Sequence, residues 1–282
     1  MTAVAYVLAL LSSLFLGVSD FTGGFLSKRA SEFAVAGASA AVAASMFLVI
    51  GVGTGKLELN RIDVTAGILG GIFLMVGTVL YFRALAKGRM GVIGGTATLL
   101  VLIPLISDIV AGNTPSTLSL VGIAITIGGV ILLGAPEMRG GTGLGPVFLA
   151  AIAAVFLGLQ QLATSKGSAQ NVLGTLVVTE LVVLAIIVAI GLFARSNGGL
   201  SRKAIPLILI VGVTDALSVW TFSKATTGGD IAIVSVLSAL DPIVISLLAV
   251  FFLKEKLSKL QVVAILIVIL GGVVLALGGS SV

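Results

Sequence analysis

Several acidic residues stand alone inside long apolar stretches of this sequence, where a carboxyl group is costly. On insertion scales a charged side chain at the centre of a membrane costs about 2.5–3.5 kcal/mol, so acids retained there mark substrate or ion pathways by default. We therefore expect these residues to bind a solute or a coupling ion. They are Asp20, Asp108, Glu180, Asp215 and Asp241.

The stretch "LSALDPIVIS" places Asp241 directly before a proline in the middle of an apolar segment. Pro242 has no N–H to bond to the carbonyl of Ser238, four residues earlier, and it disfavours helical angles at Asp241. We expect an opened turn with a free acceptor beside a carboxyl group, which is tolerated only inside protein or beside a water-filled cavity. The alternative is a kinked helix whose aspartate caps freed backbone groups or pairs with Lys224.

Other polar residues near these acids extend the candidate site. The end of the first apolar segment reads "GVSDFTGG", and the matching part of the sixth reads "GLQQLATSK". Polar positions in corresponding segments point to a substrate site, although Asp20 also fits an interfacial ion pair with Lys28 or Arg29. Trp220 fits either stacking on a solute or anchoring at the membrane interface. The predicted substrate-binding residues are Ser19, Asp20, Gln160, Gln161, Asp215, Ser218, Trp220, Ser238 and Asp241, and the predicted coupling residues are Asp108, Glu180 and Asp241.

The composition excludes most classes of soluble protein. Hydrophobic residues make up 58% of the 282 residues and charged residues only 10%, whereas roughly a quarter of the residues in soluble domains are charged. The chain has no cysteine and no histidine, which excludes disulfides and the usual zinc sites, so we expect no cofactor and no metal. The net charge of +5 fits basic cytoplasmic loops better than a nucleic-acid surface.

Ten apolar segments, separated by short polar or glycine-rich breaks, predict ten transmembrane helices. A helix of about 20 residues spans the bilayer, and lipid-exposed irregular backbone is not tolerated there. The opening "MTAVAYVLALLSSLFLG" lacks the basic region of a signal peptide and is interpreted as the first span. The predicted spans are 4–26, 33–53, 64–82, 91–111, 118–134, 146–164, 172–193, 205–222, 231–253 and 260–278.

The two halves of the chain are similar to each other. Each half has a proline in its fourth segment, Pro104 or Pro242, and a glycine pair in its fifth. Pro104 shares a helix face with Asp108, four residues later, and is predicted to break its helix as Pro242 does. We expect an all-α membrane protein of two five-helix repeats, residues 1–135 and 146–282, joined by a linker at 136–145. Because five is odd, the repeats must be inverted relative to each other, as in many secondary transporters.

Positive charge is unevenly distributed among the loops. Loops after the odd-numbered segments hold twelve Lys and Arg residues, and the remaining loops hold four. By the positive-inside rule the first set faces the cytoplasm. This orientation puts both termini outside.

The order of these motifs resembles the EamA domain of the drug/metabolite transporter superfamily, present twice in tandem. The motifs are "FLGVSD", "YFRALAKG", the proline of the fourth segment and the closing glycine pair. In the second half, "LDPIVISLLAVFFLKEKLS" places Glu255 at the acidic position of the family signature, whereas the first half has "GNTPSTLS" and no acid there. The family's common arginine in the second helix is absent, and Glu180 occupies the counterpart region of the seventh. The resemblance implies transport of small metabolites, amino acids or drugs.

We predict a secondary active transporter that moves small metabolites such as amino acids, as an exporter, with proton coupling left open. The alternatives are a polyspecific drug exporter, against which the few aromatic residues argue, and a channel or scaffold without alternating access. No G-x-x-x-x-G-K-[ST] nucleotide motif and no G-x-G-D motif of intramembrane aspartyl proteases occurs, so no enzyme activity is expected. The expected partners are a small-molecule solute and the lipid bilayer of a bacterial or archaeal plasma (inner) membrane, with no nucleic acid, as a monomer or homodimer. The lack of basic residues within the spans disfavours a strongly anionic solute.

Overall fold

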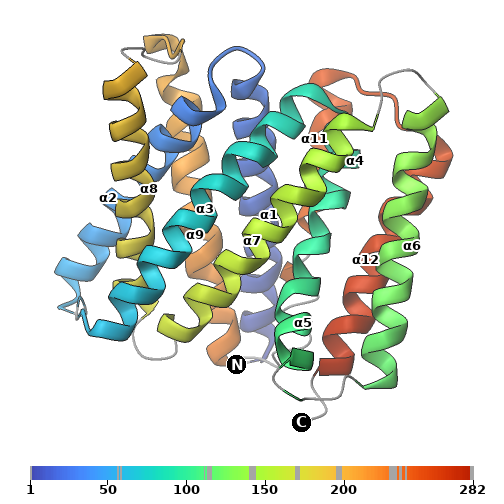
Figure 1. Ribbon diagram of the computed structural model, residues 1–282, viewed down its shortest axis with the longest axis horizontal. Coiled ribbons are helices and arrows are strands. Elements are labelled where there is room, and N and C mark those ends of the chain that lie inside the picture. The colour runs from blue at the N-terminus through green and yellow to red at the C-terminus, as the bar shows by residue number, and fades with distance from the viewer. Residues whose placement is uncertain are drawn as a thin grey trace.

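The structure is a computed structural model that describes residues 2–55, 57, 59–110, 112, 116–139, 144–168, 172–194, 199–228, 234, 237–238 and 240–279. All regular elements in these ranges are helices, which run side by side between two ends of the molecule (Figure 1). The all-α prediction is therefore confirmed for the described part of the chain.

The helices follow the predicted segments closely. In the first half they are α1 (Thr2–Ser27), α2 (Glu32–Gly53), α3 (Arg61–Lys87), α4 (Met90–Ala97), the 3-10 turn η1 (Thr98–Val101), α5 (Leu102–Val110) and α6 (Thr117–Arg139). In the second half they are α7 (Gly145–Ser168), α8 (Val172–Ala194), the 3-10 turn η2 (Arg202–Ala204), α9 (Ile205–Gly228), α11 (Asp241–Leu253) and α12 (Lys259–Gly279). Within the described ranges six helices are long and apolar enough to cross a membrane, and four shorter apolar helices accompany them.

The fourth and ninth predicted spans are not continuous helices. In the first half, η1 separates α4 from α5, and Pro104 lies in the first turn of α5, so it cannot donate a helical bond to the carbonyl of Leu100. In the second half, α11 begins at Asp241 with Pro242 in its first turn, while most of residues 231–239 lie outside the described part. The expected kink inside a helix is thus a helix start, where a proline removes no needed N–H.

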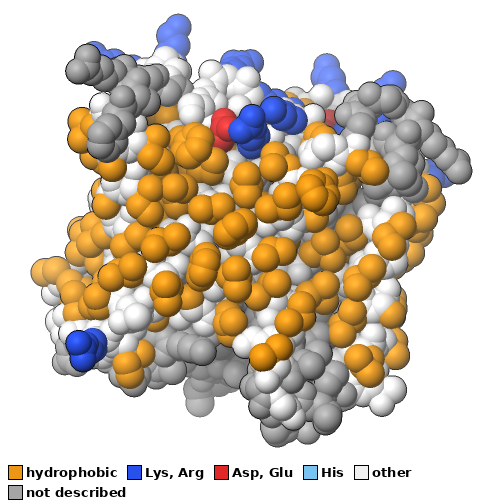
Figure 2. Space-filling view, viewed as in Figure 1, with side chains coloured by type: hydrophobic (Ala, Val, Ile, Leu, Met, Phe, Trp, Pro, Cys, Tyr) orange, Lys and Arg blue, Asp and Glu red, His pale blue; other side chains and the backbone are white. Residues whose placement is uncertain are grey.

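On the face shown in Figure 2, exposed apolar side chains cover the middle of the molecule, and most of the charged residues lie at one end of it. Val49, Phe148, Phe251 and Phe252 are 68–75% exposed. A continuous apolar surface of this extent is typical of contact with lipid. The chain is therefore an integral, multi-pass membrane protein.

Glycines bring helices of the two halves into close contact, and the same contacts recur between counterpart helices. A Cβ atom on Gly71 of α3 would lie 2.7 Å from Cβ of Val182 in α8, and one on Gly212 of α9 would lie 2.5 Å from Cβ of Val42 in α2. The two glycines are 141 residues apart (212 − 71) and the two valines 140 (182 − 42). Small residues at such positions let helices pack closely in lipid.

The contact between α6 and α12 repeats the same relation. A Cβ atom on Gly129 would lie 2.7 Å from Cγ2 of Val268, and one on Gly271 would lie against Oγ1 of Thr126. Both the glycines and their partners are 142 residues apart (271 − 129 and 268 − 126). The same contact therefore occurs twice. Gly129 in the first half meets Val268 in the second, and Gly271 in the second half meets Thr126 in the first.

Candidate functional site

Four of the predicted acids come from four helices and interact with one another in the interior. Asp20 of α1 interacts electrostatically with Asp241 of α11 and with Asp215 of α9, and Glu180 of α8 interacts with Asp215. These contacts link the residues in the order Glu180, Asp215, Asp20, Asp241, and we call this set the acid cluster. The side chain of Asp108, the fifth predicted acid, lies outside the described part of the structure.

Tyr81 of α3 joins the acid cluster, and sequence reasoning missed it. Its hydroxyl lies beside the carboxyl group of Asp20 and interacts with it, and its side chain is only 4% exposed. The hydroxyl of a buried tyrosine normally has a partner, and Tyr81 is one of only two tyrosines in the chain. A tyrosine inside an apolar span was therefore the available signal. The contact also shows that Asp20 has a partner in the interior, whereas an interfacial pair with Lys28 or Arg29 was the alternative.

The starts of the helices show how deep the acids lie. Glu180 is eight residues (180 − 172) from the start of α8, which is about 12 Å along the helix. Asp215 is ten residues (215 − 205) from the start of α9, about 15 Å along it. These two helices run in opposite directions (Figure 1). Both carboxyl groups therefore lie well inside the bundle rather than at its ends.

Three serines that the sequence assigned to substrate binding take part in contacts between helices. Ser19 donates to a carbonyl of α9 at 3.1 Å. Ser12 and Ser218 each donate to the other's carbonyl oxygen, at 3.0 and 2.9 Å. Ser238 donates to a carbonyl of α1 at 3.4 Å. These hydroxyl donors are satisfied by backbone oxygens, so the structure gives them a role in joining helices to α1.

The structure does not bring the remaining predicted residues into the acid cluster. Gln160 is partly buried, and its Nε2 donates to Oγ1 of Thr164 at 3.4 Å on the same helix. Gln161 is exposed, and Trp220 is 41% exposed.

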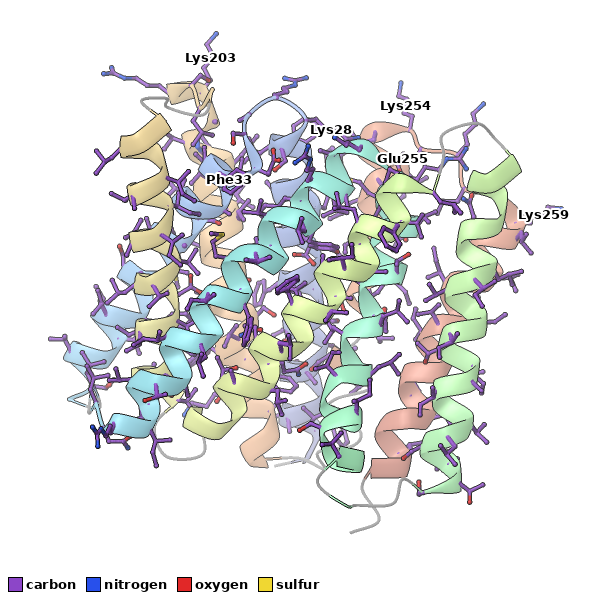
Figure 3. All side chains as sticks on the ribbon, viewed as in Figure 1. Lys28, Phe33, Lys203, Lys254, Glu255 and Lys259 are labelled. Carbon is purple, nitrogen blue, oxygen red and sulfur yellow. The ribbon has the colours of Figure 1, made fainter. Side chains whose placement is uncertain are left out.

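The end of the bundle that carries the labelled lysines, here called the basic end, has its own acidic residue (Figure 3). The carboxyl oxygens of Glu255, in the loop after α11, accept hydrogen bonds from the backbone N–H of Met90 at 3.0 and 3.3 Å. They satisfy one of the amides that the start of α4 leaves free. Partial burial raises the pKa of Glu255 above its ordinary value of 4.5, against the opposing effects of the Met90 N–H, Lys28 and Arg89.

The fold and the acid cluster define an all-helical, multi-pass membrane protein with ionisable groups in its interior. The model of the EamA-like transporter family matches residues 144–277, which comprise α7 to α12 and include Glu255. One solved crystal structure superposes with a TM-score of 0.69 over 97% of this chain and 96% of that chain. At 18% sequence identity that likeness shows the fold alone. No curated protein matches the chain. The family match supports the drug/metabolite transporter superfamily that the motifs indicated.

Proposed function

We propose that this chain is a secondary active transporter of the drug/metabolite transporter type, which moves small metabolites by alternating access. The observation that carries the proposal is the acid cluster, because ionisable groups inside a membrane bundle mark solute and ion pathways. The match of residues 144–277 to the EamA-like transporter family supports the same class. Small amino acids and amines are the solutes to test first, and export is the proposed direction.

The proposed architecture is ten spans in two inverted repeats, residues 1–135 and 146–282. The recurring glycine contacts support it, because an inverted repeat makes each contact between the halves occur twice at a constant offset. Lys28, Lys203, Lys254 and Lys259 lie at one end of the molecule (Figure 3). Their position supports an orientation in which this basic end faces the cytoplasm.

The test is exchange in proteoliposomes. Vesicles are loaded with a mixture of unlabelled amino acids and amines, and the uptake of each radiolabelled solute is measured against empty vesicles. A carrier is accelerated by solute on the far side, whereas a channel is not. Acceleration by no solute of the mixture would contradict the proposal and favour a channel or scaffold.

A substitution in the acid cluster connects exchange to the site. Asp241→Asn is expected to abolish exchange while the protein still inserts and elutes from size-exclusion chromatography as the wild type does. The matched control is Glu32→Gln, which removes an acid at the basic end that lies 3.7 Å from Arg83. Wild-type exchange by the Asp241→Asn variant would remove this residue from the mechanism.

A further inference from the structure

Among the residues that the structure describes, no Lys or Arg side chain is found to interact with the four acids of the acid cluster. Every Lys and Arg whose side chain the structure describes lies in a loop or within about one turn of a helix end. Arg83, near the end of α3, is 50% exposed and lies 3.7 Å from Glu32 at the basic end. Several carboxyl groups in a medium of low dielectric constant cannot all ionise unless a cation compensates them.

Glu180 is an acid of the cluster to which a ligand could donate. Its side chain is 6% exposed, it receives no hydrogen bond from any described residue, and the charge it interacts with belongs to another acid, Asp215. Its neighbour Thr179 differs, since that hydroxyl donates to the carbonyl of Thr175 at 2.9 Å. A buried carboxyl group without a donor pays its desolvation cost uncompensated.

The arrangement of the acids favours an organic cation over a metal ion. Within the described residues no three acidic side chains converge closely enough to hold a metal ion, whereas a bound Ca²⁺ needs six or more oxygen ligands around one point. The acids are instead linked in series through four helices. An ammonium group offers three N–H donors and needs few acceptors. Two or more separated amino groups of one ligand can therefore each bind to different acids of the cluster.

Apolar side chains beside the acids suit the carbon chain of such a ligand. Val183 is three residues after Glu180 on α8, and Val211 is four residues before Asp215 on α9. These spacings place each valine on the same helix face as its acid. Both valines are buried, at 3% and 1% exposure. The acids are thus separated by apolar side chains, as the amino groups of an aliphatic polyamine are separated by methylene groups.

We propose that the acid cluster binds an aliphatic organic cation with two or more amino groups, and that this is the solute the protein transports. The inference rests on the proposed transport function. Glu180 and Asp215 bind one ammonium group, and Asp20, which lies beside Tyr81, binds another together with Asp241.

Spermidine is the probe for the first experiment, with alanine and glutamate as neutral and anionic controls. Addition of spermidine to the purified protein raises the unfolding temperature saturably, because a ligand that binds only the folded state stabilises it. In proteoliposomes loaded with spermidine, uptake of radiolabelled spermidine is accelerated, whereas the two controls give no acceleration. Magnesium chloride at the same concentration does not displace spermidine.

Variants then locate the binding site. Glu180→Gln and Asp215→Asn each weaken spermidine binding by about tenfold or more, since a hydrogen bond to a charged group contributes about 1.5–3 kcal/mol. Asp215→Glu retains the charge and binds more tightly than Asp215→Asn. Glu32→Gln, outside the cluster, binds as the wild type does. Circular dichroism and size-exclusion chromatography of each variant report folding separately from binding.

The outcomes separate this inference from the proposed function. Exchange of alanine without binding or exchange of spermidine overturns the polyamine inference and leaves the transporter proposal standing. Displacement of spermidine by equal magnesium overturns the choice of an organic cation. Wild-type affinity in both Glu180→Gln and Asp215→Asn overturns the assigned site. Absence of exchange with every solute overturns the transport proposal, and this inference with it.

Discussion

The helices α1 and α3 lie close together, whereas α7 and α9, which correspond to them in the proposed repeat, lie further apart. At the basic end α1 packs directly on α3. A Cβ atom on Gly23 would lie against the ring of Phe82, and one on Gly24 would lie 2.6 Å from Cβ of Leu85. Over their described residues, α7 and α9 make no comparable contact.

The two helix pairs also differ in the residue at the corresponding position. At the offset of 141 residues seen elsewhere, the counterpart of Gly23 is Thr164 (164 − 23). Glycine lets two helices approach, whereas Thr164 carries a side chain whose Cγ2 packs against Gly70 of α3 and whose hydroxyl donates to the carbonyl of Gln160 at 3.0 Å. The bundle is thus closed between α1 and α3 and more separated between α7 and α9. If the protein works by alternating access as proposed, α1 and α3 move apart during transport while α7 and α9 move together.

The largest expected effect comes from breaking the closed pair. Gly23→Leu would place a side chain against Phe82 and push α1 away from α3. Overpacking typically costs about 1–3 kcal/mol, and about 1.4 kcal/mol on a barrier changes a rate tenfold. We expect the exchange rate in proteoliposomes to fall by roughly tenfold or more. The control is Gly128→Leu, because a Cβ atom there meets nothing within 4 Å. Equal exchange by both variants would show that the α1–α3 contact is not needed.

A second pair of glycines tests a contact in which the two halves are alike. Gly128 and Gly129 are adjacent in α6, but only Gly129 faces α12, against Val268. We expect Gly129→Val to lower the free energy of unfolding by about 1–3 kcal/mol relative to Gly128→Val. Thermal unfolding in detergent gives the comparison, and the adjacent position cancels the difference in helix propensity. Equal unfolding temperatures would contradict the α6–α12 packing.

The contact between α1 and α9 contains a pair of hydrogen-bonded serines, whereas the corresponding contact between α3 and α7 is apolar. Ser12 and Ser218 exchange hydrogen bonds, whereas the counterpart interface between α3 and α7 packs Gly77 against Leu157. A double-mutant cycle with Ser12→Ala and Ser218→Ala is expected to give a coupling of about 0.6 kcal/mol, the average for hydrogen bonds between membrane helices. The measurement is again thermal unfolding of the single and double variants. Purely additive effects would indicate that the two hydroxyls act independently.

The smallest expected effect is the pH dependence of Glu255, an acid that the first half lacks at the corresponding position. Because the pKa of Glu255 is raised in the folded protein, the folded state binds more protons there than the unfolded state. Its contribution to stability is therefore full below pH 4.5 and is lost as the pH rises through the raised pKa. We expect the stability of the wild type relative to Glu255→Gln to decrease over that range. Parallel stability profiles of the two proteins would contradict this.

The fold class and the positions of the spans could be predicted from the sequence, because a bilayer requires long apolar helices. Apolar runs of about 20 residues must form helices in lipid, and each predicted span overlaps a described helix. The detail at Pro242 was not accessible. A proline disrupts a helix interior but suits its first turn, and the sequence alone did not place the start of α11 at Asp241.

The candidate site was accessible only in part. The cost of an acid in lipid identified Asp20, Glu180, Asp215 and Asp241, but that cost says nothing about which acids meet. The same polarity also selected Ser19 and Ser218, which the structure uses to join helices. Tyr81 was overlooked because its ring is ordinary in an apolar helix.

By itself the sequence determined that this chain is a helical membrane protein, and it determined which of its residues are too costly to be incidental, because both follow from the energy of transferring groups into lipid. Only the tertiary structure decided that acids from α1, α8, α9 and α11 interact and that α1 is closed on α3. These features depend on which helix faces meet. The faces that meet are set by the packing of small residues such as Gly23 and Gly71 against particular partners. Those partners are far away in the sequence, so a local sequence pattern does not reveal them.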